Sequence, residues 1–292
     1  MSRVELRGNG VLVAGATGGI GKVVARQLAE RGAKVALLAR PSERLERAVA
    51  ELEGYGAIGV PADITDRGQV VDAANEAADR FGGLVGVVAG AGTVIPDTIG
   101  EQPEEDARKV IDVNLYGTLW TIQATLPHVD RTGGHLLALA SISGITPVPL
   151  TGLYSASKAA VGELIAQLRM ELMHRETTAG VVYLGMVDTQ MSAGVKEDQR
   201  VDRALSSTPG GLTRPLKVED AAKRVVHALE HRQRAVVTPV WQLPFAAPQL
   251  GMQALVETGM RATAIARELP GRKQRAPFDD AIEPDDDDGD RD

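Results

Sequence analysis

The sequence predicts a doubly wound α/β fold, in which helices cover both faces of a seven-stranded parallel sheet. Three observations support this prediction. Short apolar runs alternate with longer segments of helical spacing along most of the 292 residues, which is the rhythm of repeated βαβ units. The apolar runs contain few polar residues, as expected for parallel strands buried on both faces. A glycine-rich turn joins the first run to the first helix, and such sheets commonly begin in this way.

The elements are expected in a regular order. Strands are predicted at 10–14, 34–39, 57–60, 84–89, 135–140, 181–184 and 235–238, because each run is short and apolar. Helices are predicted between them, at 19–31, 42–53, 66–81, 104–126, 154–176 and 218–231. The segment 190–216 shows no clear strand and holds glycines and prolines among polar residues. Ligands bind such folds at the carboxyl ends of the strands, so the residues that follow these ends are the candidates for a site.

The first candidate is the turn Gly15-Ala16-Thr17-Gly18-Gly19-Ile20-Gly21, with the spacing G-x-x-x-G-x-G. One glycine permits the tight turn, one lets the backbone approach a pyrophosphate, and one lets the helix pack closely on the strand. The amides at the start of the helix then face the anion. A plain tight turn before a helix is the alternative interpretation.

The second candidate is the pair Tyr154 and Lys158. A spacing of four residues places both side chains on one face of a helix. A free tyrosine has a pKa of about 10, and a nearby ammonium group is expected to lower that pKa toward neutrality. Ser141 follows an apolar run thirteen residues earlier, and a hydroxyl there can polarise a carbonyl oxygen. Alone, the pair is a weak signal, since a surface helix can carry it by chance.

Together these residues resemble the short-chain dehydrogenase/reductase family, in its short single-domain branch. The resemblance extends from about Val11 to about Pro239, some three quarters of the chain. It implies a Rossmann-type fold and a nicotinamide cofactor. It also implies catalytic roles for Asn114, Ser141, Tyr154 and Lys158. In these roles, Tyr154 exchanges the proton, Ser141 holds the substrate oxygen, and Lys158 holds the nicotinamide ribose. Asn114 kinks its helix and holds a water that links Lys158 to solvent.

Arg40 bears on the choice of cofactor. It follows the second strand, and no acidic residue stands at 38–40. An acidic residue there would bind the ribose 2′-hydroxyl of NAD and repel a 2′-phosphate, whereas arginine can bind a phosphate. NADP(H) is therefore expected rather than NAD(H), with Thr17 as a second group near the phosphate. A solvent-exposed loop cation is the alternative interpretation of Arg40.

The resemblance assigns further cofactor contacts to residues after other strands. Asp63 corresponds to the residue that accepts from the adenine amine, and it could equally form an Asx turn or cap a helix. Thr189 corresponds to a nicotinamide or phosphate contact, with a helix N-cap as the alternative. Ala89 to Gly92 stand where the family usually has N-N-A-G, so the side-chain hydrogen bonds of the two asparagines are missing. The expected cofactor set is Gly15, Thr17, Gly19, Ile20, Gly21, Arg40, Asp63, Ile64, Ala89, Gly90, Tyr154, Lys158, Val187 and Thr189.

The composition excludes several classes of protein. Cysteine is absent, so disulfides and thiol catalysis are excluded, and a reducing compartment is favoured. The start of the chain has no signal-peptide pattern and no run reaches membrane-span length. The net charge of −7 comes from residues 279–292, which carry −8 and leave +1 for the remainder. Nucleic-acid binding is not indicated. His227 and His231 have metal-ligand spacing but no acidic or cysteine partner nearby, so no metal site is expected.

Three regions are expected along the chain: 1–239 as the dinucleotide-binding and catalytic domain, 240–275 as a helical extension, and 276–292 as an acidic disordered tail. In the extension, Met252, Leu255, Val256 and Met260 mark one helical face. That face could pack on its own domain, on another subunit or on a membrane surface, and the first is favoured.

The combined prediction is a cytoplasmic, NADP(H)-dependent oxidoreductase that interconverts a carbonyl and an alcohol on a small molecule, as a homodimer or homotetramer. The alternative is a non-catalytic NADP(H)-binding sensor or scaffold of the same fold, which needs the glycine turn but not the four catalytic residues.

Overall fold

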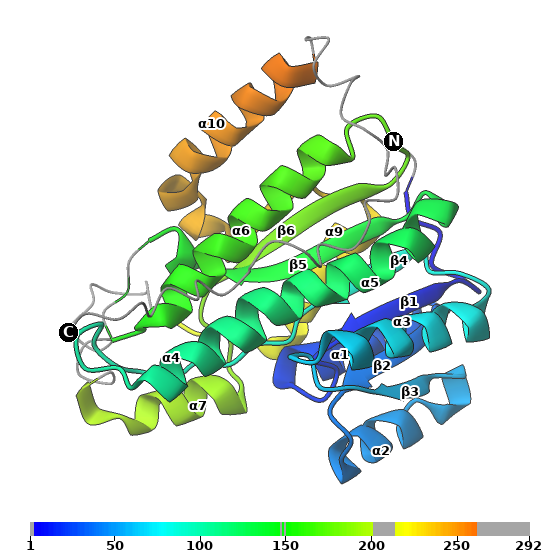
Figure 1. The fold of residues 1–292 in the computed structure, drawn as a ribbon, viewed down its shortest axis with the longest axis horizontal. Coiled ribbons are helices and arrows are strands. Elements are labelled where there is room, and N and C mark those ends of the chain that lie inside the picture. The colour runs from blue at the N-terminus through cyan, green and yellow to red at the C-terminus, as the bar shows by residue number, and fades with distance from the viewer. Residues whose placement is uncertain (1–2, 147, 149, 201–213, 262–292) are drawn as a thin grey trace, which may run out of the picture.

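The computed structural model describes residues 3–146, 148, 150–200 and 214–261. Within these ranges, seven parallel strands form one sheet in the order β3-β2-β1-β4-β5-β6-β7 (Figure 1). This is the Rossmann-type arrangement that the sequence predicts. The strands are β1 (Gly10–Ala14), β2 (Lys34–Ala39), β3 (Ile58–Pro61), β4 (Gly86–Ala89), β5 (His135–Ser141), β6 (Thr178–Leu184) and β7 (Ala235–Thr238).

Helices cover both faces of the sheet. One face carries α3 (Arg67–Phe81), α5 (Gly117–Thr132) and α6 (Leu153–Glu171). The other carries α1 (Gly19–Glu30), α2 (Glu43–Ala50) and α9 (Val218–Glu230). Successive strand residues alternate between the two cores: Leu12 of β1 packs with α3 and α5, while Val11 and Val13 pack with α1 and α9. This two-residue period is why both faces of each strand must be apolar.

Local signals explain where several helices begin and end. Asp66 caps α3 by accepting from the Gln69 amide at 3.1 Å, and Gly82 ends that helix at φ +76°. The alanines of α3 are buried, and their small side chains let the helix lie close to the sheet. The remaining elements are α4 (Glu104–Ile111), α7 (Gln190–Glu197), α10 (Leu243–Arg261), the 3₁₀ turns Glu53–Tyr55, Ile142–Gly144 and Val240–Gln242, and the π-helical turn Asp112–Tyr116.

Two sequence predictions need correction, and one further segment contains a helix that the sequence left unassigned. The helix expected at 104–126 is divided into α4 and α5 by the π-helical turn and continues to Thr132. The helix expected to reach residue 176 ends at Glu171. The segment 190–216 begins with the helix α7, because Thr189 provides a capping box for it; residues 201–213 lie outside the described ranges.

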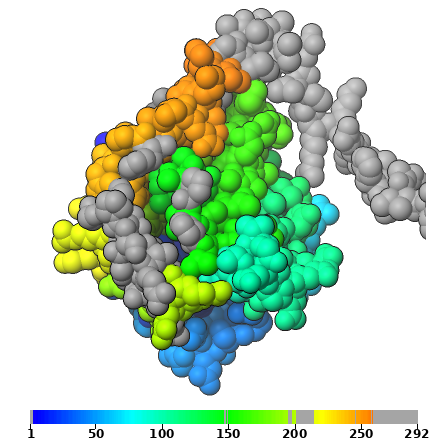
Figure 2. Space-filling view, turned by 90° about the vertical axis from the view of Figure 1, so that its left-hand side faces the viewer, coloured from blue at the N-terminus to red at the C-terminus, as the bar shows by residue number. Residues whose placement is uncertain are grey.

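The helix α10 packs beside α6 and forms a ridge of the molecular surface (Figures 1 and 2). Ala246 is fully buried in this contact, which agrees with packing on the chain's own fold. Met252, Leu255 and Val256 face outward and are 61%, 67% and 49% exposed. The acidic tail 276–292 and the side chain of Met260 lie outside the part of the chain that the structure describes. No helix among the described residues is long and apolar enough to span a bilayer.

His135 begins β5 and is fully buried. Its Nδ1 lies 2.7 Å from the Thr178 hydroxyl, and its Nε2 has no partner among the described residues. Burial, followed by the nearby Arg232, lowers the pKa of His135 to about 3. Unfolded histidine has a pKa of about 6.5. The unfolded chain therefore binds the extra proton between these values, and this residue destabilises the fold as the pH falls from 6.5 toward 3.

We expect the substitution His135→Leu to reduce the acid sensitivity of the fold. Between pH 7 and pH 4, His135 should account for a loss of about 3 kcal/mol in the free energy of unfolding. Urea unfolding of both proteins at the two pH values measures this directly. An equal pH dependence in the variant and the parent chain would contradict the buried, neutral state of His135.

Candidate active site

The predicted site residues gather at the carboxyl edge of the sheet, where β1 and β4 lie side by side. From β1 the chain proceeds to β2 and β3 on one side, then returns to β4 on the other. A crevice at such a reversal point is the usual ligand site of this architecture. The glycine turn after β1 and the Ala89–Gly92 turn after β4 both border it.

The glycine turn is shaped for close backbone approach. Gly15 has φ +76°, and a Cβ there would lie 2.8 Å from the Cα of Ala91, so the turns after β1 and β4 touch. A Cβ on Gly21 would collide with the Gly15 carbonyl oxygen, which is why α1 can start directly on the turn. No side chain caps α1, and its first turn contains no acidic residue. Its first amides are thus suited to an anionic ligand.

Two distant predicted contacts meet across this turn. A Cβ on Gly19 would lie 2.8 Å from Thr189 Cγ2, so the start of α1 faces the loop after β6. The Thr189 hydroxyl accepts from the Ser192 amide at 3.3 Å, as an N-cap of α7. Val187 is buried, and the Leu216 backbone hydrogen-bonds to the residues on either side of it.

Arg40 and Asp63 lie at the ends of the neighbouring strands β2 and β3. Arg40 is exposed. Asp63 accepts from the amide and the hydroxyl of Thr65, at 2.9 and 2.7 Å, so the Asx-turn interpretation holds. These hydrogen bonds, helped by the charge of Arg40, lower the pKa of Asp63. Ile64 packs against Gly117 at the start of α5.

Asn114 is fully buried in the π-helical turn between α4 and α5. Its Oδ1 accepts from the Thr93 amide at 2.7 Å, and its Nδ2 donates to the Thr93 carbonyl oxygen at 2.9 Å. Nδ2 also donates to the Ser157 hydroxyl at 2.9 Å, and this hydroxyl donates to the Tyr154 carbonyl oxygen at 2.7 Å. Asn114 therefore ties the loop after β4 to the first turn of α6.

Ser141 ends β5 and contacts Tyr154. Its hydroxyl accepts from the Ser143 hydroxyl at 2.9 Å and from the Ser143 amide at 3.2 Å. A hydroxyl that accepts twice has only its own proton left to donate. The Ser141 hydroxyl acts on the Tyr154 phenol and lowers its pKa, so this proton can be directed toward the phenol or toward a ligand oxygen beside it.

Lys158 is 5% exposed. Its Nζ donates to the Leu139 carbonyl oxygen at 3.0 Å and lies 5.9 Å from the centroid of the Tyr154 ring. A Cβ on Gly92 would lie 3.3 Å from both this amine and Asn114 Oδ1. The glycine thus leaves room for the two side chains to approach the same point. Burial lowers the pKa of Lys158 to about 8.

The expectation that Lys158 lowers the pKa of Tyr154 is wrong for this structure. The pKa of Tyr154 is raised, because burial outweighs the hydrogen bond from Ser141 that lowers it. The amine of Lys158 is itself poorly solvated and directed at the Leu139 carbonyl. Burial thus favours the neutral forms of both groups.

A pocket of about 390 Å³ opens beside the start of α6. It combines apolar side chains with hydroxyl groups, and the Thr151 and Ser155 hydroxyls lie 2.6 Å apart. Its lining is Asp97, Thr98, Ile99, Val148, Leu150, Thr151, Gly152 and Ser155.

A family model described as short chain dehydrogenase matches residues 9–200. The chain belongs to the short chain dehydrogenase family. It is 33% identical over 234 residues to an uncharacterized oxidoreductase of Staphylococcus aureus. The matched region covers 80% of this chain and 96% of that protein. The family and this relative together support the assignment of the chain as an oxidoreductase.

Two solved structures are similar over most of the fold. A short chain dehydrogenase from Burkholderia cenocepacia in complex with NADP is 30% identical with a TM-score of 0.70, covering 80% of this chain and 96% of that chain. A short chain dehydrogenase/reductase from Burkholderia phymatum in complex with NAD is 25% identical with a TM-score of 0.73, covering 82% and 92%. A nicotinamide cofactor is therefore bound by both neighbours, and its type differs between them.

Sequence reasoning missed three residues of this short chain dehydrogenase site: Gly92, Thr93 and Ser157. Gly92 was noted only as part of an unusual turn. Ser157 stands one residue before Lys158, and its position one helical turn after Tyr154 was an available signal. Thr93 acts through its backbone, so no side-chain pattern could reveal it.

The His227 and His231 rings stack with centroids 3.8 Å apart, and no group of three metal-binding side chains occurs among the described residues.

We expect Lys158→Met to stabilise the fold at pH 7. The lowered pKa corresponds to a penalty of about 3 kcal/mol for burying the charge, and losing the hydrogen bond to Leu139 offsets about 1 kcal/mol. The net gain of about 2 kcal/mol should shrink as the pH rises from 8 to 10.5, since the unfolded chain alone then binds the proton. Urea unfolding across this range measures it, with Lys109→Met on the exposed face of α4 as control. A variant less stable than the parent at pH 7 would contradict the uncompensated burial of Lys158.

Proposed function

We propose that the protein is an NADP(H)-dependent oxidoreductase that interconverts a carbonyl and an alcohol on a small organic molecule. One observation carries the proposal: Ser141, Tyr154, Lys158 and Asn114 meet beside the glycine turn at one edge of the sheet. A proton-exchanging phenol, a hydroxyl and a buried amine beside a dinucleotide cradle are the groups that hydride transfer to a carbonyl requires.

The cofactor fits the residues present. The uncapped start of α1 offers amides to a pyrophosphate, and the exposed Gly18 and Gly19 leave the backbone open to it. Arg40 would bind the 2′-phosphate and Asp63 the adenine, although Asp63 already accepts two hydrogen bonds from Thr65. The full proposed cofactor set is Gly15, Thr17, Gly19, Ile20, Gly21, Arg40, Asp63, Ile64, Ala89, Gly90, Tyr154, Lys158, Val187 and Thr189.

The bound cofactor would supply the hydride to the carbonyl carbon, and the chain's own residues would handle the proton. In reduction, the Tyr154 phenol donates its proton to the carbonyl oxygen, while the Ser141 hydroxyl donates a hydrogen bond to the same oxygen and stabilises its developing charge. The raised pKa keeps Tyr154 protonated, as this direction needs. In oxidation, the phenolate accepts the proton of the alcohol, so this direction should become faster at alkaline pH.

Lys158 and Asn114 would set the position of Tyr154. The Lys158 amine would hold ribose hydroxyls and stabilise the phenolate through its charge. Asn114 and Ser157 anchor the first turn of α6 to the loop after β4. The pocket beside α6, with Ile99, Val148 and Leu150 in its lining, would take the substrate's apolar part.

The rival proposal is a non-catalytic NADP(H)-binding sensor or scaffold. It requires the glycine turn and Arg40, but it does not account for the hydrogen bonds that aim Ser141 at Tyr154. The catalytic proposal is therefore favoured. A homodimer or homotetramer is proposed on the family membership, with the exposed apolar face of α10 as one surface available for it.

We expect Tyr154→Phe to lower kcat for carbonyl reduction by a factor of about 10² to 10⁴, because the proton donor is removed. Stopped-flow or steady-state NADPH oxidation with an accepted ketone measures it. Tyr183→Phe is the matched control, since the buried Tyr183 hydroxyl has no hydrogen-bond partner in the part of the chain that the structure describes and should be dispensable for turnover. Full turnover by Tyr154→Phe would overturn the catalytic role of Tyr154 and favour the rival proposal of a non-catalytic sensor or scaffold.

We expect Arg40→Asp to weaken NADPH binding by on the order of 100-fold, because a charged hydrogen bond is lost and repulsion is added. NADH binding should change little. Fluorescence titration with both cofactors measures this, and Arg44→Asp, also exposed nearby, controls for the added charge. Equal losses for NADPH and NADH would contradict the role of Arg40 in selecting the phosphate.

We expect Ser143→Ala to lower kcat for reduction by about tenfold, the value of one hydrogen bond. Without the Ser143 hydroxyl, the proton of Ser141 is no longer directed toward Tyr154. The apparent pKa of Tyr154 in the pH–rate profile should therefore rise further. A purely structural role would lower the stability and leave that profile in place, and this result would contradict a positioning function for Ser143.

A further inference from the structure

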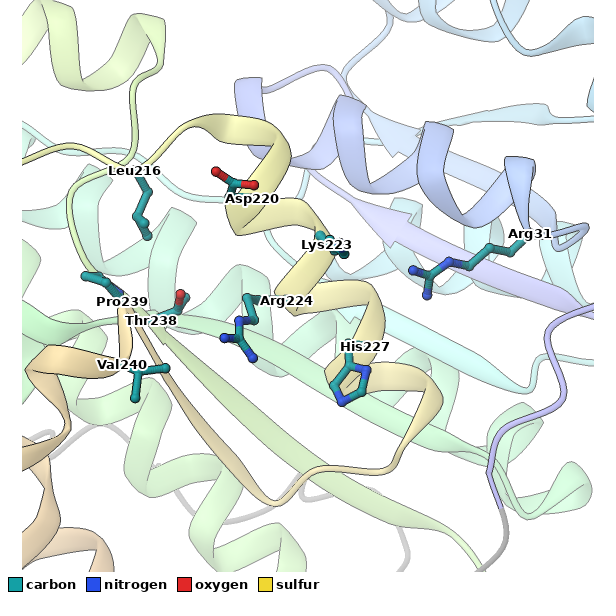
Figure 3. Close-up of a pocket in the computed structure, with 9 residues that line it drawn as sticks. All are labelled: Arg31, Leu216, Asp220, Lys223, Arg224, His227, Thr238, Pro239 and Val240. Carbon is teal, nitrogen blue, oxygen red and sulfur yellow. The ribbon is translucent and has the colours of Figure 1, made fainter.

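A second pocket lies on the face of the sheet opposite to α6 (Figure 3). We call it the α9 pocket; its volume is about 440 Å³. Arg31 approaches from the end of α1, and Lys223, Arg224 and His227 project from α9. The end of β7 and the turn at Val240 form the other wall. None of these residues belongs to the candidate active site.

The α9 pocket carries an excess of positive charge. Lys223 and Arg224 are exposed, and neither has an ion-pair or side-chain hydrogen-bond partner among the described residues. Arg31 pairs with Glu230 at 3.0 Å, and Asp220 is the acidic residue of the lining. The pKa of His227 is lowered, mainly by burial and then by His231, with Arg224 and Arg31 adding to the effect against Glu230. Lys223 and Arg224 therefore remain without an ion-pair partner among the described residues, and against the carboxylate of Asp220 they leave one net positive charge for a carboxylate ligand.

The chain itself contains a matching segment. Residues 279–292 carry a net charge of −8, whereas the rest of the chain carries +1. This segment lies outside the described residues. We propose that the acidic segment 279–292 binds in the α9 pocket of its own chain, with its carboxylates accepting hydrogen bonds from Lys223 and Arg224.

The chain is long enough for this contact. The pocket wall at Val240 precedes the start of α10 by three residues, so α10 leads away from the pocket. Its 19 residues extend over about 28 Å at 1.5 Å per residue. The residues from 261 to 279 can span at most about 60 Å, which exceeds the distance back to the pocket.

Attachment to the same chain also favours this occupant over a free anion or a second copy. A tethered segment is present at a high effective concentration, in the millimolar range for short linkers. Its adjacent aspartates can also contact Lys223 and Arg224 together, each with its own carboxylate. Individual exposed ion pairs are weak, so several at once are needed for occupancy.

The test uses the full chain and a carbodiimide, which joins a carboxylate to a lysine amine only when the two are in contact. Mass spectrometry should find Lys223 joined to acidic residues of 279–292. In a mixture of isotopically light and heavy protein, the joined residues should belong to the same molecule. The yield should fall strongly near 1 M salt, where the screening length is about 3 Å.

Two matched variants keep Lys223 as the reporter. Arg224→Gln removes the neighbouring cation that has no ion-pair partner and should reduce the Lys223 yield by up to about fivefold, the value of one surface pair. Arg131→Gln, on α5 across the sheet, should leave the yield unchanged. The proposal is overturned if Lys223 is not joined, if both variants behave alike, if the yield persists at high salt, or if the products join only different molecules.

Discussion

The candidate site depends on the burial of the Lys158 amine. The described residues place no carboxylate beside it, and it donates a hydrogen bond to the Leu139 carbonyl oxygen. The amine reaches this point because Gly92 has no side chain, and Asn114 Oδ1 borders the same space. Burial lowers the pKa of Lys158 and raises that of Tyr154. At neutral pH the Tyr154 phenol is therefore protonated and neutral, whereas the Lys158 amine, with its pKa lowered only to about 8, keeps its charge for a polar ligand.

Hydrogen bonds between neighbouring elements hold the reacting groups in register. The π-helical turn carries Asn114 inward, where it binds the loop after β4 and, through Ser157, the first turn of α6. Single-turn π-helices commonly mark functional positions. Ser143 constrains Ser141 in a similar way. The parallel sheet provides the rigid support, since strands β1, β4 and β5 are adjacent and end at the same edge.

The seven strands could be predicted because each is buried on both faces and therefore apolar throughout. The glycine turn and the Tyr154/Lys158 pair could be predicted because their chemistry depends on spacing within one segment. The π-helical turn could not, because it depends on tertiary contacts of Asn114 with Thr93 and Ser157. The direction of the Tyr154 pKa shift was wrongly predicted, since charge proximity is visible in a sequence while burial is not. For the helix α7 the sequence offered only the N-cap alternative at Thr189, because the rest of that segment is rich in glycine and proline.

The central claim is that the crevice between the turns after β1 and β4 binds a nicotinamide dinucleotide with a 2′-phosphate. Titration of the purified protein with NADPH and with NADH, followed by nicotinamide fluorescence, tests it most directly. The account predicts saturable binding of both, with NADPH markedly tighter. If neither NADPH nor NADH binds, the claim is contradicted. That result would indicate that the Ala89–Gly92 turn, without the usual asparagines, does not support a cofactor site.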